Sequence, residues 1–398
     1  MQQHESWLLP EGIEEILPRE AIYLENLRGK LLRLLSCWGY ELVIPPMIDF
    51  IDSLLTGSGH DLDLQTFKLI DQVSGKTLGI RADMTPQVAR MDAHQIKPNS
   101  PARLCYAGTV LHTRGDPLDK TRSPMQIGAE LYGHAGIESD IEIISLMLEV
   151  LAQSGILDVH LDLGHVGIFQ ALSSQAGLTH GQESLLFNIL QRKARPELEE
   201  WLGDADINTD IKQMLAVLPE LNGGLDTINK ARNLLVKAEQ PVNDALANLE
   251  AIAGKITQYF PALPISFDFA ELRGYHYHTG VVFAAFVPMV GKEIARGGRY
   301  DNIGAVFGRA RPATGFSADL KQLAILGKHA AQETQQQRIL APYLDGDNAL
   351  EETIRDLRAQ GYCVIKQLPG QQGTAEELRC TAVLEQDNHQ RWVIGSIA

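Results

Sequence analysis

A small set of polar and aromatic side chains, spread over three short stretches, has the types needed to bind a small polar ligand. The set combines carboxylates, a hydroxyl, an amide, a guanidinium and rings that can stack: Asp83, Thr85, Gln126, Glu130, Arg273, Tyr277 and His278. A carboxylate accepts hydrogen bonds from an ammonium or a ring N–H, and a guanidinium donates two parallel hydrogen bonds to a carboxylate. The residue types therefore point to recognition of a small polar molecule.

The stretch MQIGAELYG places an amide and an acid on one face of an expected strand. Successive side chains of a strand alternate between faces, so Gln126, Gly128 and Glu130 share one side, while Ile127 and Leu131 share the other. The glycine leaves room for a small polar ligand to approach the sheet. The same pattern also fits an ordinary solvated sheet face, and spacing alone leaves both interpretations open.

The stretch ELRGYHYHTG supplies the remaining candidates. Arg273 fits either a clamp for a ligand carboxylate or an ion pair with Glu271. Tyr277 and His278 fit either the lining of a ligand site or the edge of the core. The glycines in GGRYDNIGAVFG likewise fit a turn as well as a ligand cradle.

Other kinds of site lack their sequence signatures. The chain has no GxxxxGK[ST] phosphate loop and no HExxH motif, and its four cysteines form no CxxC pair. We therefore expect no bound metal, no cofactor and no disulfide, with reduced thiols in a cytoplasmic protein. The N-terminus does not have the layout of a signal peptide, and the longest apolar stretch, VVFAAFVPMV, is too short to span a bilayer.

The negative net charge of the chain helps to decide whether a nucleic acid is an expected partner. The formal net charge is −15 at pH 7. Nucleic acids bind proteins largely through clustered Lys and Arg. This balance argues against a broad phosphate-binding surface, and we expect neither a nucleic-acid nor a membrane partner.

The elements that must position the polar residues follow from hydrophobic periodicity. Residues 18–37 and 138–153 fit amphipathic helices, FKLID and TLGIR fit a hairpin, and TGFSADLKQLAILGKH fits a glycine-led final helix. From about 166 to 258 the pattern is helical and polar, which predicts a helical insertion. AAQETQQQ is the best linker candidate, and residues 338–398 have a βαββ-like pattern. The layout predicts an α+β body with a helical insertion and a small C-terminal α/β segment.

These stretches, in this order, resemble the catalytic domain of class II histidyl-tRNA synthetases over roughly residues 8–328. RADMTPQVAR is similar to the histidine-binding segment R-P-E-G-T, and YAGTVLH with MQIGAELYG is similar to motif 2 and the Q-x-G-x-E strand after it. ELRGYHYHTGVVF is similar to the segment R-G-L-D-Y-Y, and GGRYDNI with ATGFSADLKQL is similar to motif 3. The resemblance implies an α+β fold with a class II synthetase-like antiparallel sheet flanked by helices. We expect a domain at 1–328, a linker at 329–337 and a C-terminal domain at 338–398.

Carried over position by position, the resemblance implies a pocket for free L-histidine. In such a pocket Asp83, Thr85 and Gln126 hold the α-ammonium. Glu130 accepts a hydrogen bond from an imidazole N–H, and Arg273 faces the carboxylate.

The ring-lining positions and one ammonium ligand depart from the family pattern. Tyr277 and His278 are implied to line the imidazole, but His278 stands where the family has a tyrosine. Asp83 replaces the family's glutamate and is one methylene shorter.

The ATP-binding pattern of a synthetase is broken. Class II enzymes hold ATP with one arginine from motif 2 and one from motif 3. Gln322 stands at the motif 3 arginine position and Asp319 stands where the family has a glycine. His112 stands at the motif 2 position, with Arg114 two residues further on. Losing one preorganised cation typically lowers a rate by ~10²–10³, so we expect the pocket to be kept and adenylation to be lost.

That combination resembles the histidyl-tRNA-synthetase-like regulatory subunits of ATP phosphoribosyltransferase. The resemblance implies a non-catalytic chain of histidine biosynthesis that activates a short-form catalytic subunit and mediates feedback inhibition by histidine. It also implies a homodimer within a hetero-oligomer, joined through the GYELVIPPMIDF region and the helix before it. The alternatives are a working histidyl-tRNA synthetase and a scaffold with a vestigial histidine pocket.

Overall fold

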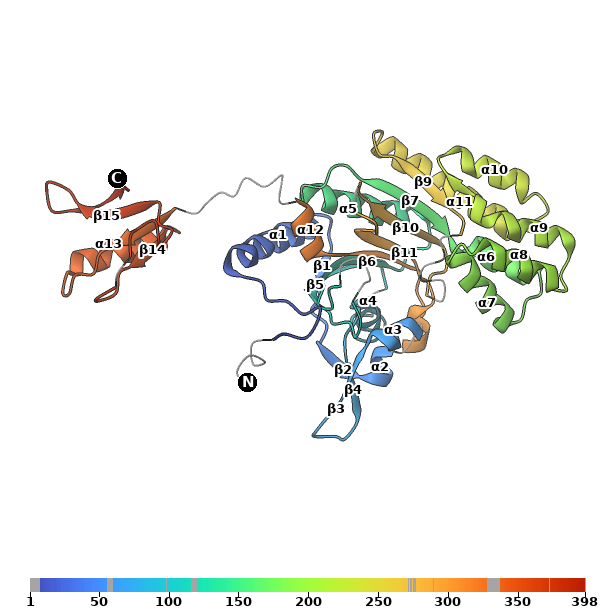
Figure 1. Ribbon diagram of the computed structural model, residues 1–398, viewed down its shortest axis with the longest axis horizontal. Coiled ribbons are helices and arrows are strands. Elements are labelled where there is room, and N and C mark those ends of the chain that lie inside the picture. Colours follow the sequence, from blue (N-terminus) through green and yellow to red (C-terminus); the bar gives the residue numbers. More distant parts are fainter. Residues whose placement is uncertain are drawn as a thin grey trace. The chain divides into compact units, whose positions relative to one another are not determined.

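The computed structural model describes residues 8–55, 60–97, 99–115, 120–270, 272, 274, 277–288, 290–327, 337–371 and 373–397. The chain divides into two compact units, Met1–Ala330 and Ala331–Ala398. Figure 1 shows the elements of each unit. None of the described helices is long and apolar enough to cross a membrane.

The first unit is built on a nine-stranded sheet with the strand order β1-β5-β6-β12-β11-β10-β7-β9-β8. All neighbouring strands are antiparallel except the pairs β1–β5 and β7–β9. The strands of this sheet are β1 (Glu41–Leu42), β5 (Ala102–Thr109), β6 (Met125–Tyr132), β7 (His160–His165), β8 (Asn222–Gly223), β9 (Ile265–Asp268), β10 (Val281–Phe286), β11 (Ala295–Arg299) and β12 (Ala313–Asp319).

A smaller sheet and several helices complete the body of this unit. The smaller sheet has the order β2-β4-β3, with strands β2 (Ile48–Phe50), β3 (Phe67–Ile70) and β4 (Thr77–Ile80). The helices are α1 (Pro18–Cys37), α2 (Ile51–Leu55), α3 (His60–Gln65), α4 (Thr85–Arg90) with its π-helical continuation η2 (Met91–Ile96), α5 (Ile137–Gln153), the 3-10 helix η4 (Ile303–Phe307) and α12 (Leu320–Gly327).

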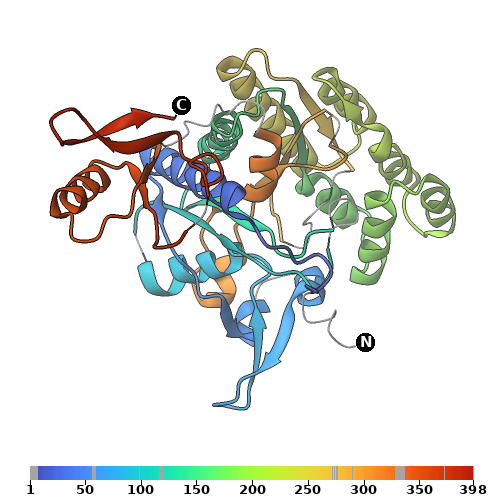
Figure 2. The ribbon, with the colours of Figure 1, turned by 60° about the vertical axis from the view of Figure 1, so that its left-hand side comes forward.

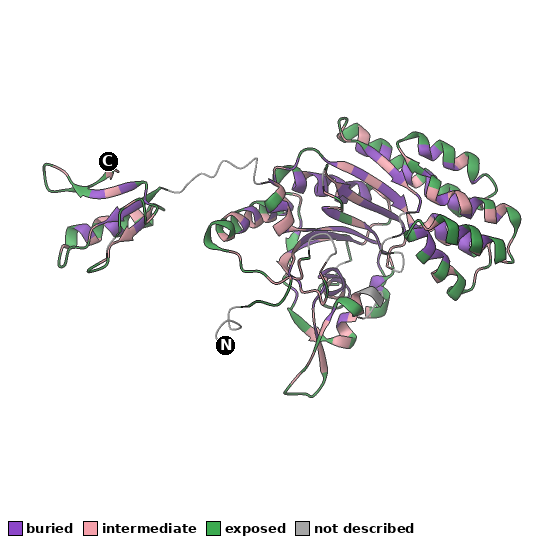
Figure 3. Cartoon of the chain, viewed as in Figure 1, coloured by how far each residue is buried: buried purple, intermediate pink, exposed green. Residues whose placement is uncertain are grey.

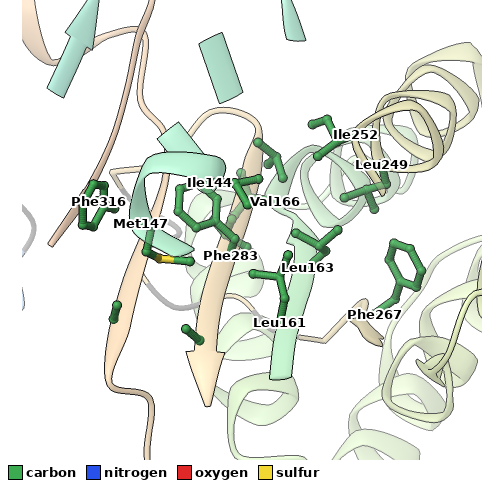
Figure 4. Packing of buried hydrophobic residues seen from close by; sticks show 14 of the residues in the cluster. Ile144, Met147, Leu161, Leu163, Val166, Leu249, Ile252, Phe267, Phe283 and Phe316 are labelled. Atoms are coloured by element: carbon green, nitrogen blue, oxygen red, sulfur yellow. The ribbon is translucent and has the colours of Figure 1, made fainter. Parts of the chain in front are cut away.

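The two faces of the large sheet carry different cores. One face packs against α5, α1 and the insertion, through aliphatic and aromatic residues such as Ile144, Leu163 and Phe283 (Figure 4). The other face carries a smaller cluster in which α4 and η4 cover β5 and β6, including Met84 and Tyr106. Figure 2 shows α1 and α5 on the opposite side of the sheet from α4.

Local sequence explains where these helices begin and what they bury. Proline fixes φ near the helical value, and Pro18 opens α1. The leucines of its stripe, from Leu24 to Leu35, recur at intervals of three and four residues and are buried. The expected helices at 18–37 and 138–153 and the hairpin β3–β4 are confirmed.

The insertion follows β7 and consists mainly of helices. Its elements are α6 (Val166–Gln175), α7 (His180–Gln191), α8 (Arg195–Asp204), α9 (Thr209–Val217), the 3-10 helix η3 (Leu218–Glu220), the short strand β8, α10 (Asp226–Leu234) and α11 (Gln240–Tyr259). Each helix buries one side and exposes the other, as Figure 3 shows.

In its described residues the second unit is a four-stranded sheet with one helix. The strand order is β14-β13-β15-β16, from β13 (Arg338–Ala341), β14 (Cys363–Lys366), β15 (Ala382–Gln386) and β16 (Trp392–Ser396). Asp347 caps α13 (Asn348–Ala359) by accepting a hydrogen bond from the Leu350 backbone N–H at 2.8 Å. Ile339, Leu350 and Ile354 form part of its core, so the expected small α/β segment is confirmed.

The expectation of one long final helix in TGFSADLKQLAILGKH is wrong for its first half. Residues 313–319 form β12, and helix α12 begins only at Leu320. β12 lies between β6 and β11 and forms hydrogen-bonded ladders with both. These tertiary pairings outweigh the local helical pattern of the segment.

Candidate functional site

A buried carboxylate lies at the centre of the smaller cluster. Glu130, on β6, is only 1% exposed. Thr85 Oγ1 and Tyr106 OH donate hydrogen bonds to its Oε1 at 3.0 and 2.9 Å, and Tyr300 OH donates to its Oε2. The Thr85 and Tyr106 hydroxyls are themselves 3.0 Å apart. The interpretation of this strand face as ordinary solvated surface is therefore wrong.

Two glycines make room for this arrangement. Gly315 is the partner of Glu130 on β12, and a Cβ atom there would overlap Glu130 Oε2. Gly128 faces the partner strand β5, and its Cβ would lie 2.5 Å from Tyr106 OH. The small residues of β6 and β12 therefore allow the acid and the tyrosine to lie flat against the sheet.

Burial changes the protonation of this acid. Desolvation raises the pKa of Glu130 to about 8, although the hydroxyls of Tyr300, Tyr106 and Thr85 oppose the rise. The negative charge of Asp83 contributes to the raised pKa. At neutral pH the Glu130 side chain therefore carries its proton for most of the time.

A second polar group lies next to Glu130, at the start of α4. Gln126 Nε2 donates to Asp83 Oδ1 at 2.8 Å, and Gln126 Oε1 accepts from the Met84 backbone N–H at 2.9 Å. The Thr85 backbone N–H also donates to Asp83 Oδ1, at 2.9 Å. The structure thus brings Asp83, Thr85, Gln126 and Glu130 into one hydrogen-bonded network.

The aromatic candidates lie at the same cluster. The Tyr277 ring is 4.8 Å from the Tyr300 ring and 5.3 Å from the His278 ring, measured between centroids. The Tyr277 hydroxyl is buried and has no hydrogen-bond partner among the described residues. The His278 ring fits against two glycines, since a Cβ atom at Gly274 or Gly298 would lie 2.5 or 2.7 Å from it. Arg273, the expected carboxylate clamp, lies outside the described residues, as does Glu271.

Sequence reasoning missed two members of the network, Tyr106 and Tyr300. Tyr106 pairs with Gly128 across β5 and β6, and this register brings its hydroxyl to Glu130. Tyr300 follows Arg299, whose guanidinium binds the Asp140 carboxylate at 2.9 Å and thereby fixes the end of β11. Tyr106 had a usable signal, because a buried tyrosine in a neighbouring strand needs a partner for its hydroxyl.

The positions that would hold ATP in a synthetase have other contacts. Asp319 Oδ1 accepts backbone N–H bonds from Met125 and Lys321, both at 3.0 Å, where β12 passes into α12. His112 Nε2 lies 3.0 Å from the Ala82 carbonyl oxygen, and the Arg114 side chain is exposed. Among the described residues, no group of His, Cys, Asp or Glu is arranged to hold a metal ion.

Comparison with known proteins assigns both parts of the chain. Residues 12–323 match the family model described as histidyl-tRNA synthetase. Residues 336–395 match the C-terminal domain of the ATP phosphoribosyltransferase subunit HisZ. The ATP phosphoribosyltransferase regulatory subunit of Methylococcus capsulatus is 56% identical over 393 residues, covering 98% of this chain and 96% of the relative. That of Alkalilimnicola ehrlichii is 52% identical over 387 residues, covering 97% and 96%.

The chain belongs to the family of ATP phosphoribosyltransferase regulatory subunits. As a member of this family it has a regulatory rather than a catalytic role in histidine biosynthesis.

Solved structures agree with this assignment. A Bacillus halodurans structure described as an ATP phosphoribosyltransferase regulatory subunit/histidyl-tRNA synthetase superimposes with a TM-score of 0.82 at 28% identity, covering 95% of this chain and 97% of that one. A histidyl-tRNA synthetase from Nostoc superimposes with a TM-score of 0.76 at 17% identity, covering 98% and 97%, and shares the fold. The class II synthetase-like fold expected from the sequence is confirmed.

Proposed function

We propose that this regulatory subunit binds free L-histidine beside Glu130 and passes the signal to a catalytic partner. The observation that carries the proposal is the buried Glu130 carboxyl. Thr85 joins it to the polar network of Asp83 and Gln126, because its hydroxyl donates to Glu130 and its backbone N–H donates to Asp83. A buried polar network of this kind is costly unless it is used or fully satisfied. A ligand that offers a ring N–H and an ammonium satisfies it.

The proposed contacts follow the network. The α-ammonium binds at Asp83, Thr85 and Gln126, which offer a carboxylate, a hydroxyl and an amide oxygen as acceptors. The imidazole binds Glu130. The unpaired hydroxyl of Tyr277 supports a second ring contact, because a buried hydroxyl gains from a partner.

Two further residues complete the proposed histidine site. His278 packs on the Tyr277 ring and lines the outer side of the imidazole. Arg273 binds the ligand carboxylate, an assignment that depends on the family resemblance alone.

The partner is proposed to be the short-form catalytic subunit of ATP phosphoribosyltransferase. In this proposal the chain activates that subunit, and histidine binding reverses the activation as end-product feedback. An effector shifts such an equilibrium only through its differential affinity for the two states. Support comes from the names of the relatives, and from a buried polar network in a chain that lacks the arginines expected to bind ATP.

A homodimer is the proposed core of the assembly. The segment after α1 exposes apolar side chains in close succession, with Leu42 50%, Ile44 82% and Ile48 47% exposed. Contiguous apolar surface of this kind marks protein interfaces. We place the dimer contact at α1 and residues 39–50, as the family resemblance implies.

We propose that the assembly acts in the cytoplasm without binding nucleic acid. Residues 166–259 hold eight Lys and Arg against twelve Asp and Glu. Most of these cations pair with carboxylates, for example Arg192 with Glu197 at 2.7 Å and Lys237 with Asp210 at 2.6 Å. Paired cations on an acidic surface do not supply the counterion release that drives RNA binding. The proposed domains remain 1–328 and 338–398, joined by 329–337.

Calorimetry and a reconstituted complex test the proposal together. L-histidine is titrated into the purified chain, and then into its complex with a short-form catalytic subunit during turnover. We expect saturable binding, activation of the catalytic subunit by this chain, and inhibition by histidine. Absence of heat and of any thermal shift at millimolar histidine would refute the histidine site and favour a scaffold. Histidine-dependent ATP–pyrophosphate exchange by the chain alone would establish a synthetase instead.

A further inference from the structure

The Glu130 carboxyl is held by hydroxyl groups, with no cation in contact among the residues that the structure describes. Its hydrogen-bond donors are Thr85, Tyr106 and Tyr300. Other buried carboxylates of this unit have a guanidinium partner, such as Asp140 with Arg299 and Asp92 with Arg311.

Among the residues that the structure describes, the titratable groups facing Glu130 are neutral or acidic. They are Tyr106 on β5, Asp83 before α4, Tyr132 on β6, Tyr277, and Tyr300 after β11. Gly315 on β12 contributes no side chain. A buried ionised carboxylate without a counter-charge is strongly disfavoured, and the described part of the site supplies no positive charge to an ionised Glu130.

We propose that Glu130 and the imidazole of bound histidine share one proton, so that histidine binding takes up a proton from alkaline solution. We further propose that Tyr106 is the positioning residue that sets the pH at which this uptake begins. The inference rests on the histidine site proposed above and defines its charge state. The proton comes from solvent and resides on a carboxyl oxygen or a ring nitrogen, and no other bond is made or broken.

The protonation of Glu130 determines how histidine affinity changes with pH. In the ligand-free protein burial holds the pKa of Glu130 at about 8, so below that pH the carboxyl already carries the shared proton. Above it, the ligand-free site holds no proton and the bound pair holds one. Since protons are then taken up on binding, histidine affinity falls by up to about tenfold for each pH unit.

Tyr106 acts on this linkage through its hydrogen bond. Its hydroxyl stabilises the ionised form of Glu130 and lowers the pKa of that carboxyl. Tyr106→Phe removes this donor and leaves the ring. Glu130 then keeps its proton to a higher pH, by about one pH unit for one hydrogen bond to a charged group.

Isothermal titration calorimetry on the full chain tests this proposal by measuring the number of protons taken up when histidine binds. Histidine binding heats are measured at pH 7.0 and 8.5 in buffers of different ionisation enthalpy, for wild type, Tyr106→Phe and Tyr132→Phe. Tyr132→Phe is the matched control, because Tyr132 lies on β6 near Glu130 and its buried hydroxyl makes no hydrogen bond to that carboxyl. The α-amino group of free histidine titrates in the same range and contributes equally to all three proteins.

We expect wild type and Tyr132→Phe to take up more protons at pH 8.5 than Tyr106→Phe, with equal uptake at pH 7.0. The decline in affinity at high pH should begin about one pH unit later in Tyr106→Phe. Equal uptake by Tyr106→Phe and wild type at pH 8.5, with affinity lowered evenly at both pH values, would overturn the inference and leave the histidine site standing. No binding by any of the three proteins at either pH would refute the histidine site itself.

Discussion

Two carboxylates on the same face of the large sheet have opposite environments. Glu130 on β6 lies opposite Gly315 on β12, and Asp319 at the end of β12 lies opposite Gln126. Glu130 is bound by hydroxyls of side chains from three separate segments, whereas Asp319 accepts two backbone N–H groups at a strand–helix junction. Glu130 thus belongs to the side-chain network that we propose binds histidine, whereas Asp319 stabilises the start of α12.

The largest effect on the proposed ligand site is expected from filling the space beside Glu130. Gly315→Ala places a methyl group where Glu130 Oε2 lies, so the carboxyl must move out of its hydroxyl network. We expect histidine affinity to fall at least about 100-fold and the free energy of unfolding to drop by about 1–3 kcal/mol. Calorimetry and urea titration measure the two effects.

Gly203→Ala is the matched control for that substitution. Gly203 lies in α8, where a Cβ atom would point into open space, and alanine favours a helix by about 0.5–1 kcal/mol over glycine. We expect unchanged histidine affinity and equal or higher stability. If Gly315→Ala behaved in the same way, the close fit around Glu130 would be irrelevant to binding.

Replacing the Glu130 carboxyl by an amide tests its proposed role in ligand binding. Glu130→Gln keeps the volume, but the amide can neither ionise nor share a proton with an imidazole. We expect histidine binding to weaken by roughly 1.5–3 kcal/mol, the usual value for a hydrogen bond to a charged group. Feedback inhibition should weaken in the same proportion, while activation of the catalytic subunit persists. Undiminished inhibition by histidine would assign the inhibitory site elsewhere.

Replacing Asp319 is predicted to lower the stability of the protein without changing its affinity for histidine. Asp319→Ala leaves the backbone N–H groups of Met125 and Lys321 without their acceptor. We expect the free energy of unfolding to fall by about 1–2 kcal/mol, as for loss of a helix N-cap. Histidine affinity should change less than about twofold. A large loss of affinity would show that Asp319 belongs to the ligand site.

The smallest effect is expected at the former motif 3 arginine position. Gln322 is half-buried on α12, and no role in histidine binding is expected for it. We expect Gln322→Ala to change both stability and histidine affinity by less than about 0.5 kcal/mol. A clear loss of catalytic-subunit activation in this variant would reveal a role for α12 in the complex.

Local patterns in the sequence were enough to predict several elements and one face of the site. The leucine spacing of residues 18–37 predicted α1, and strand alternation put Gln126 and Glu130 on one face of β6. Alternation could not decide whether that face was solvated. Its burial depends on α4 and η4, which come from distant parts of the chain and cover the strand.

The parts that could not be predicted depend on pairing between remote segments. Tyr106 and Tyr300 are far apart in sequence, and they meet at Glu130 only because β5 and β11 lie in one sheet with β6. The strand state of 313–319 likewise follows from its position between β6 and β11 and not from local propensity. Motif resemblance identified the acid and missed the tyrosines because hydroxyl partners can come from any neighbouring strand.

Arg299 has a consequence for communication through the protein. Its guanidinium ties β11 to the first turn of α5 through Asp140 and the Gly136 carbonyl, at 2.9 and 3.1 Å. The next residue, Tyr300, reaches Glu130 on the other side of the sheet. The same helix α5 carries Glu149, which accepts a hydrogen bond from the Trp38 indole N–H at the end of α1, at 3.0 Å. A shift of the Glu130 side chain thus has a route of contacts, through Tyr300, Arg299 and α5, to the helix that borders the exposed apolar residues.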